Sequence, residues 1–261
     1  MNELLIIKIG GQVIDDPQTL DRFLRELAWI ETPCILIHGG GKLATRLCER
    51  LGIEAKMIEG RRITDAATLE IVTMVYGGLI NKQIVAALQA RGKNAIGLTG
   101  ADGDLIRSKK RVHATIDYGF VGDITQVNTD AFEKIIGLGQ IPVIAPLTHD
   151  GNGQILNTNA DTMAQSVAVA LSRTFQTTLV FGFEKAGVLR DRSDESSVIS
   201  RMSRSEYKTL KEKGTVNEGM IPKLDNAFQA IDAGVRRVVI GKADRLSELL
   251  NGNSGTTLSN E

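Results

Sequence analysis

Two apolar runs near the start of the chain each end on glycines, and this repeated arrangement constrains the fold more than any other feature. Residues 4–9 run into Gly10-Gly11, and residues 34–38 run into Gly39-Gly40-Gly41. A helical pattern of apolar residues follows each turn, over residues 17–29 and 42–51. Strand, turn and helix repeated in this order predict parallel βαβ units and therefore an α/β fold.

The glycine turns also indicate a chemistry. Glycine lets the main chain approach an anion closely, and its N–H groups, with the N-terminus of the following helix, attract phosphate oxygens. Lys8 adds a cation just before the first turn. A lysine at a strand end is commonly only solvated, so it is the combination of lysine and glycines that predicts a phosphate-handling enzyme.

The composition argues against other classes of protein. Lys plus Arg and Asp plus Glu both number 31, so no overall field draws the chain to nucleic acid or to an anionic membrane. Cys34 and Cys48 fall in apolar and helical patterns that predict buried free thiols, which suits a reducing cytoplasm. Neither an export signal nor an apolar stretch of spanning length is apparent, and we expect a cytoplasmic protein without nucleic-acid or membrane partners.

Strands and helices continue to alternate along the 261 residues, which predicts one α/β domain or two closely joined lobes with a boundary near Asp150. A β-rich stretch over residues 105–128 predicts hairpins above a cleft, a candidate lid. Trp29 is predicted to pack in the core. The other expected elements are helices over residues 68–91, 159–171, 204–214 and 221–233, and strands over 94–98, 141–147, 178–183, 237–240 and 255–258.

The second glycine turn admits a competing interpretation. Residues 39–44 match the pattern G-x-G-x-x-A after a strand, and Glu59 follows about twenty residues on, as in dinucleotide-binding folds. A Walker-type P-loop is excluded, because Leu43 stands where a Ser or Thr would bind the metal. The three histidines lack the spacing of zinc ligands, and we expect no metal site built from protein side chains.

Taken in order, five segments resemble the acetylglutamate kinases of the amino acid kinase family. They are Lys8-Ile9-Gly10-Gly11, His38-Gly39-Gly40-Gly41, Gly60-Arg61-Arg62-Ile63-Thr64, Asn157-Thr158-Asn159-Ala160-Asp161 and Gly219-Met220-Ile221-Pro222-Lys223. The resemblance implies an open αβα sandwich with a mainly parallel central sheet, forming a single amino acid kinase domain over residues 1–261. Within it, residues 1–150 would form the approximate acyl-amino-acid lobe and residues 151–261 the nucleotide lobe, and the chain would be a homodimer.

The resemblance also implies roles for individual residues. Lys8 and Lys223 would be the two cations on the transferring phosphoryl group, and Asp161 the carboxylate that orients both. The remaining roles are phosphate binding by the main chain of Gly10, Gly11 and Gly40, substrate binding by Gly40, Gly41, Arg62 and Asn157, and nucleotide binding by Glu184, Gly187, Val188, Leu189 and Met220. One departure stands out, because the family has a Ser/Thr-Asp-Val segment where this chain reads Phe183-Glu184-Lys185-Ala186.

The implied activity is ATP-dependent phosphorylation of the γ-carboxylate of N-acetyl-L-glutamate, or of another N-acyl-glutamate, in arginine biosynthesis. Mg²⁺ would travel with ATP on its phosphates. The alternatives are a nicotinamide-dependent oxidoreductase, a non-catalytic kinase-fold regulatory subunit, and a kinase that prefers N-succinyl-glutamate. The last is suggested by the basic run Arg107-Ser108-Lys109-Lys110-Arg111, which would lie near the extra carboxylate or, as such runs commonly do, form a solvated hairpin.

A further expectation concerns regulation. The first strand begins at about Glu3, whereas the arginine-sensitive hexamers of this family carry an extra N-terminal helix. We therefore expect no feedback inhibition by arginine.

Overall fold

The computed structural model describes residues 1–58, 61–191, 194, 196–214 and 220–260. Three residues used in the sequence interpretation, Glu59, Gly60 and Gly219, lie outside the described residues.

An eight-stranded sheet forms the centre of the molecule, in the order β12-β14-β13-β11-β1-β2-β8-β5. Strand β1 (Glu3–Ile9) lies between β2 (Cys34–His38) and β11 (Gln176–Phe183) and is parallel to both, so all three strands end at the same edge. Among the pairings of this sheet in the described residues, β13–β14 is antiparallel and the others are parallel. The predicted, mainly parallel α/β sheet is confirmed. The other strands are β5 (Ala95–Leu98), β8 (Ile141–Ile144), β12 (Arg201–Ser203), β13 (Arg237–Lys242) and β14 (Thr256–Ser259).

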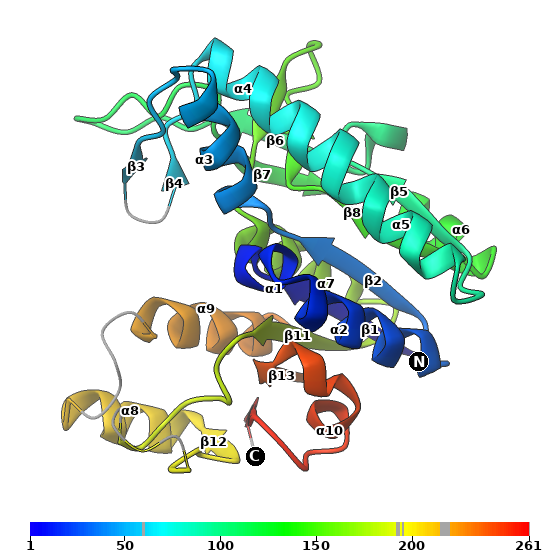
Figure 1. The fold of residues 1–261 in the computed structure, drawn as a ribbon. Coiled ribbons are helices and arrows are strands. Elements are labelled where there is room, and N and C mark those ends of the chain that lie inside the picture. Colours follow the sequence, from blue (N-terminus) through cyan, green and yellow to red (C-terminus); the bar gives the residue numbers. More distant parts are fainter. Residues whose placement is uncertain (59–60, 192–193, 195, 215–219, 261) are drawn as a thin grey trace.

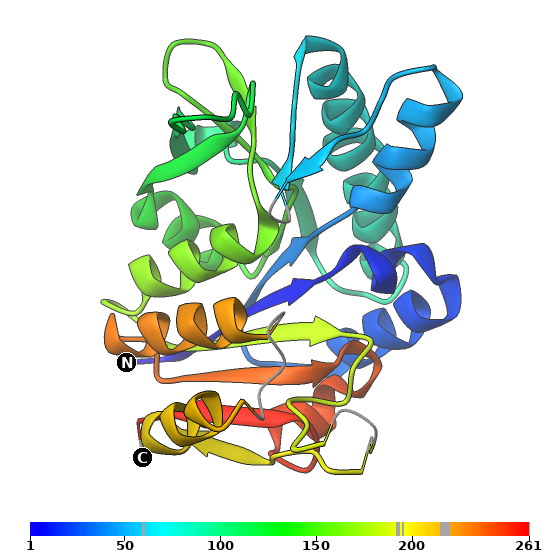
Figure 2. The same ribbon diagram turned by 90° about the vertical axis from the view of Figure 1, so that its left-hand side faces the viewer.

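Helices cover both faces of this sheet (Figures 1 and 2). Along β1, Leu4 and Ile6 pack into the core beneath one layer, whereas Leu5 and Ile7 pack into the other, because successive strand residues point to opposite faces. The first layer holds α6 (Thr129–Gly137), α7 (Ala160–Leu171), α8 (Arg204–Glu212) and α9 (Ile221–Asp232); the second holds α1 (Gly11–Asp15), α2 (Pro17–Trp29), α3 (Gly41–Arg50), α4 (Ala66–Val72), α5 (Asn81–Gln89) and α10 (Leu246–Leu250). This is the expected αβα sandwich, with Cys34 and Cys48 buried as free thiols.

A smaller sheet accounts for the β-rich stretch. Its order is β10-β9-β6-β7, from Ile155–Asn157, Leu147–His149, Ile106–Lys110 and Gly122–Val127. The strand predicted over residues 141–147 divides in two after Ile144, and β9 joins this second sheet, since Pro146 has no N–H to continue a ladder. The hairpin β3 (Met57–Ile58) and β4 (Arg61–Arg62) stands nearby and contributes to the same end of the molecule (Figure 1).

The long helix predicted over residues 68–91 forms, but it is continuous from Ala66 to Gln89 and its middle third, Thr73–Ile80, is a π-helix. Gly77-Gly78 lies in this wide part, where low helix propensity favours such a change. By length and composition the helix is also apolar enough to cross a membrane, contrary to the expectation that no segment comes near this limit. Here its buried residues pack on the sheet, as in the core helices of soluble proteins.

The prediction for Trp29 is wrong, since its side chain is 84% exposed. It is the last residue of α2, whose buried residues are Phe23, Leu24 and Leu27. At about 100° per residue, position 29 falls on the side of the helix opposite these three. The division into two lobes near residue 150 stays a prediction, and α7 packs on both β1 and β11, on either side of the proposed boundary.

Candidate active site

The carboxyl ends of β1 and β11 bring together the charged residues predicted for phosphoryl transfer. Lys8 is 7% exposed, and its Nζ lies 2.8 Å from Oδ1 of Asp161 in the first turn of α7. Asn159 caps this helix by accepting a hydrogen bond from the N–H of Thr162, which fixes the first turn, where Asp161 lies. Two residues that are 153 positions apart in sequence numbering thus form one ion pair.

Lys223 reaches the same place from the first turn of α9. Its Nζ lies 4.0 Å from the centre of the Phe183 ring, and the Nζ of Lys8 lies 5.1 Å from that centre. Burial lowers the pKa of Lys223, as does the charge of Lys8, whereas Asp161 and Glu184 act in the opposite direction. The site therefore concentrates two cations with one closely paired carboxylate, an arrangement suited to a highly charged anion.

The two glycine turns face one another beside these cations. A Cβ on Gly11 would lie 3.5 Å from the main-chain nitrogen of Gly41, and one on Gly39 would lie 3.2 Å from that of Gly11. Gly40 has φ +151°, and a Cβ there would fall 2.3 Å from a methyl group of Ile80 in the π-helix. Only glycine fits at position 40, and the close approach of the two turns places two sets of helix N-terminal N–H groups in one cradle.

A buried polar chain supports the second turn from below. His38 and Asn81 are both fully buried. The His38 Nδ1 lies 2.8 Å from the Gly39 carbonyl oxygen, and its Nε2 lies 3.3 Å from Nδ2 of Asn81, which also donates to the Val143 carbonyl. Burial lowers the pKa of His38 to about 4, so the ring is neutral at neutral pH. These contacts place the His38 ring beneath the glycine turn, where it supports the main chain.

Arg62 closes the other side of the glycine turn. It is 5% exposed, and its Nη2 donates to the Gly41 carbonyl oxygen at 2.8 Å and to Oγ1 of Thr45 at 2.7 Å. Its Nε and Nη1 are buried and have no hydrogen-bond partner among the described residues. A buried guanidinium with neutral partners and two unused donors is prepared for a carboxylate.

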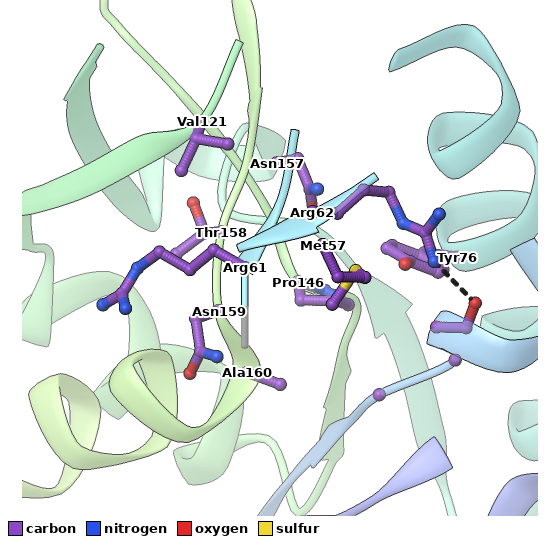
Figure 3. Close-up of a pocket in the computed structure, with 13 residues that line it drawn as sticks. Met57, Arg61, Arg62, Tyr76, Val121, Pro146, Asn157, Thr158, Asn159 and Ala160 are labelled. Carbon is purple, nitrogen blue, oxygen red and sulfur yellow. Dashed lines mark hydrogen bonds between the residues drawn. The ribbon is translucent and has the colours of Figure 1, made fainter. Parts of the chain in front are cut away.

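A cavity of about 140 Å³ adjoins Arg62 and the glycine turn (Figure 3). Asn157 lines it from the end of β10, and its Nδ2 donates to Oγ1 of Thr64 at 3.0 Å. Tyr76 lines the cavity from the π-helix, with its ring packed below Gly40. The predicted substrate residues Gly40, Gly41, Arg62 and Asn157 are thus brought together in one cavity.

Arg61 lines the same cavity, although the family resemblance assigned a role only to Arg62. In Figure 3 its side chain leaves β4 on the side opposite to that of Arg62 and extends toward Thr158 and Asn159. No ion pair or hydrogen bond joins its guanidinium to a residue in the described ranges.

The basic run 107–111 does not lie where the N-succinyl hypothesis requires it, which is beside the acyl group of the substrate. None of its residues lines the cavity. Arg107 is paired with Asp104 and Arg111 with Asp123, so part of its charge is already balanced. The segment agrees with the other interpretation, in which it is a solvated hairpin with Lys109 and Lys110 exposed.

The residues predicted to bind the nucleotide follow β11. Glu184 is exposed and acts electrostatically on Lys223. Gly187 and Val188 are buried, and the Val188 N–H donates to Oγ1 of Thr256 at 2.8 Å. Leu189 forms a bridge with Val198, and Met220 lies directly before α9. The nucleotide role of these residues stays a prediction. Among the residues that the structure describes, no group of three or more His, Cys, Asp or Glu is arranged to hold a metal ion.

Comparison with known proteins decides which family this geometry represents. The model of the amino acid kinase family matches residues 3–242, nearly the whole chain. The chain belongs to the amino acid kinase family. This agrees with the resemblance of the five segments and gives no support to a dinucleotide-binding fold.

Two relatives within this kinase family have the same name. The chain is 56% identical to "Acetylglutamate kinase" of Cytophaga hutchinsonii, with 99% of each chain covered. It is 54% identical to "Acetylglutamate kinase" of Parabacteroides distasonis, over 95% of this chain and 97% of the relative. Among solved structures, N-acetylglutamate synthase from Neisseria gonorrhoeae, complexed with coenzyme A and N-acetyl-glutamate, has a similar fold, with a TM-score of 0.84 at 24% identity over 99% of this chain and 59% of that one.

Several residues of this kinase site were missed in the sequence. Tyr76 lies in a helical pattern that reads as core, and nothing in its spacing points to a cavity. Asn81 and Thr45 are likewise ordinary helix residues until the fold brings them beside His38 and Arg62. A signal was available only for Phe183, since it lies in the segment that departs from the family pattern.

Proposed function

We propose that this chain transfers the γ-phosphoryl group of ATP to the γ-carboxylate of N-acetyl-L-glutamate in arginine biosynthesis. One observation carries the proposal. The glycine cradle has the cations Lys8 and Lys223 on one side and, on the other, Arg62, whose Nε and Nη1 have no hydrogen-bond partner among the described residues. A phosphoryl donor and a carboxylate acceptor would therefore meet across Gly40 and Gly41. The names of the curated relatives point to the same reaction.

The acceptor needs no general base, because a γ-carboxylate is already ionised at neutral pH. The obstacle is repulsion between that carboxylate and the triphosphate. Lys8, Lys223 and the N–H groups of Gly11 and Gly40 would offset the charge that spreads over the transferring phosphoryl oxygens, with Asp161 holding Lys8 in place. Arg62 and Asn157 would fix the α-carboxylate so that the γ-carboxylate points in line.

We propose the Mg²⁺ complex of ATP as the nucleotide substrate. Mg²⁺ prefers phosphate oxygens and water over a complete set of protein ligands, and it would neutralise part of the triphosphate charge. The carboxylates of Asp161 and Glu184 lie at the phosphoryl end of the site, where they fit an ion held mainly by phosphates.

The experiment that tests the function is a coupled ADP-release assay over a panel of acyl amino acids. We expect ADP release with N-acetyl-L-glutamate and none with N-acetyl-L-aspartate, whose reacting carboxylate is one methylene closer to the α-carbon. Absence of ADP release with every N-acyl-glutamate would overturn the proposal and favour the non-catalytic alternative. A nicotinamide-dependent reaction would instead appear as a change in cofactor absorbance.

N-succinyl-glutamate remains a second candidate substrate, and Arg61 is the observation that favours it. The structure gives this cavity a second guanidinium, which makes no ion pair with any of the described residues. The acetyl group is neutral, whereas a succinyl group would present a carboxylate at the place toward which Arg61 extends. Arg61, rather than the run 107–111, would then discriminate between the two substrates.

A homodimer in the cytoplasm completes the proposal. Met74 and Leu79 on the π-helix are large apolar side chains with 55% and 46% of their surface exposed. Burial of such residues against a second copy would stabilise a dimer. Light scattering should give twice the chain mass for the wild type and a smaller mass for Leu79→Lys. A wild-type monomer would contradict the assignment.

A further inference from the structure

The aromatic ring of Phe183 makes a cation–π contact with both lysines of the phosphoryl site. The ring lies at the carboxyl end of β11, where the Nζ atoms of Lys223 and Lys8 are 4.0 Å and 5.1 Å from its centre. Phe181 stacks on it, with the ring centres 6.1 Å apart and the planes at 13°. Phe183 thus packs against a second ring on one side and contacts the two ammonium groups.

The two lysines depend on the ring to different extents. Lys8 has the carboxylate of Asp161 at 2.8 Å as well as the ring. In the described part of the chain, Lys223 makes no ion pair, and the ring is its close contact. Among the charges that act on Lys223, that of Asp161 favours the charged form and that of Lys8 acts against it. The ring adds a close contact that holds the Lys223 ammonium beside a like charge.

An aromatic face does this without cancelling the charge. The ring quadrupole attracts an ammonium group, and the attraction is larger where water is partly excluded. A carboxylate in the same place would also hold the lysine, but it would repel the triphosphate and occupy the donors that the phosphoryl oxygens need. A ring leaves the N–H groups free to bind the substrate.

We propose that Phe183 is a positioning residue for phosphoryl transfer, whose ring holds Lys223, and to a smaller extent Lys8, at the glycine cradle. The inference rests on the proposed kinase function and adds to it a residue that the family pattern does not predict, since a Ser or Thr is expected at this position. Phe183 acts through the lysines and makes no proposed contact with substrate.

The decisive test separates the electrostatics of the ring from its volume. Phenylalanine at position 183 is replaced by its 4-fluoro, 3,5-difluoro and 3,4,5-trifluoro analogues, which weaken the attraction for a cation stepwise with little change in size. We expect kcat to fall with each added fluorine, by about tenfold in total, with little change in the KM for N-acetyl-L-glutamate. Phe183→Leu should lower kcat by at least as much, whereas Phe183→Tyr should retain activity.

Phe181 provides the matched control. It stacks on Phe183 and is 6% exposed, but neither lysine lies over its ring in the described structure. The same fluorine series at position 181 should leave kcat unchanged. A flat series at 183, or equal slopes at 181 and 183, would overturn the inference.

The wild-type assay keeps this result apart from the kinase proposal. If the wild type is active and kcat does not change across the fluorine series, the proposed role of Phe183 is rejected and the kinase function still stands. An inactive wild type counts against the function itself. In that case the affinity for a non-hydrolysable ATP analogue, measured by calorimetry across the series, still tests whether the ring positions phosphate-binding lysines, and an unchanged affinity would reject it.

Discussion

The phosphoryl end of the site and the acyl-amino-acid cavity both present buried cations, but they prepare them differently. At the phosphoryl end, Lys8 is paired with a carboxylate and Lys223 lies over an aromatic ring. In the cavity, Arg62 is held by a carbonyl and a hydroxyl oxygen, and two of its nitrogens have no partner among the described residues. Each lysine of the phosphoryl end thus has an attractive partner that holds it in place, whereas Arg62 keeps two donors without a partner in the described structure.

This difference indicates which step each region serves. A cation whose charge must act on a developing transition state needs a fixed position, because it stabilises that state best when it is already in place. A cation that binds an already ionised α-carboxylate can be left unsatisfied, since the substrate completes its hydrogen bonds on arrival. Substitutions at the phosphoryl end should therefore lower kcat, whereas those in the cavity should raise a KM.

The largest effect is expected for Lys8→Ala and Lys223→Ala. Each removes a preorganised charge that is typically worth about 3–4 kcal/mol, so kcat should fall by two to three orders of magnitude. Steady-state assays would measure it, with circular dichroism to show an intact fold. Lys134→Ala, on the exposed side of α6, is the control. Turnover within a few-fold of wild type in both variants would remove these lysines from the site.

The glycine turn shared by the two regions gives a prediction about stability. The pKa of His38 is about 4 in the folded state and about 6.5 when exposed. The unfolded chain therefore binds the proton more readily, and folding stability falls as the pH drops from about 6.5 toward 4. The contribution of His38 to this loss should be about 3 kcal/mol.

Urea unfolding at several pH values would measure this contribution. His38→Gln should show a smaller decline in unfolding free energy between pH 7 and 4 than the wild type shows. Identical slopes for the two proteins would mean that His38 is not held neutral beneath the turn.

Arg62→Ala tests the cavity directly. Loss of a charge-assisted contact to the α-carboxylate, about 2–3 kcal/mol, should raise the KM for N-acetyl-L-glutamate about a hundredfold. The KM for ATP should not change, and kcat should stay within a few-fold of wild type. A changed ATP constant with an unchanged amino-acid constant would place Arg62 in the wrong region.

The smallest effect concerns the acyl group. If Arg61 pairs with a succinyl carboxylate at the partly exposed edge of the cavity, the contact is worth about 1 kcal/mol. Arg61→Leu should then lower the ratio of kcat/KM for N-succinyl-glutamate over that for its neutral isostere N-butyryl-glutamate about fivefold. Lys109→Ala, in the exposed basic run, is the matched control and should leave this ratio unchanged. Equal ratios in the wild type and Arg61→Leu would assign the cavity to neutral acyl groups.

The fold was predictable to a large extent because its signals are local. Apolar runs that end on glycines indicate parallel strands and turns, and both lie where the pattern places them. The ion pair of Lys8 with Asp161 was implied by the family resemblance and not by spacing, since nothing local joins the end of β1 to the start of α7. Trp29 shows how a single residue type can mislead when helical phase is not considered.

The supporting contacts were not predictable, for a physical reason. His38 and Asn81 become a hydrogen-bonded pair only when the sheet and the π-helix pack together, and each is ordinary in its own segment. Phe183 differs from both, because the sequence marked it as a departure without indicating what it would contact. Only the folded structure shows that two lysines lie over the Phe183 ring.

The central claim is that the two regions together phosphorylate a carboxylate. Trapping of the product with hydroxylamine tests it most directly, because an acyl phosphate forms a hydroxamate, whose ferric complex is coloured, and a phosphate ester does not. Wild-type protein with Mg²⁺, ATP and N-acetyl-L-glutamate should give one hydroxamate for each ADP released, and Lys223→Ala should give less of both in the same proportion. ADP release without hydroxamate would contradict the account.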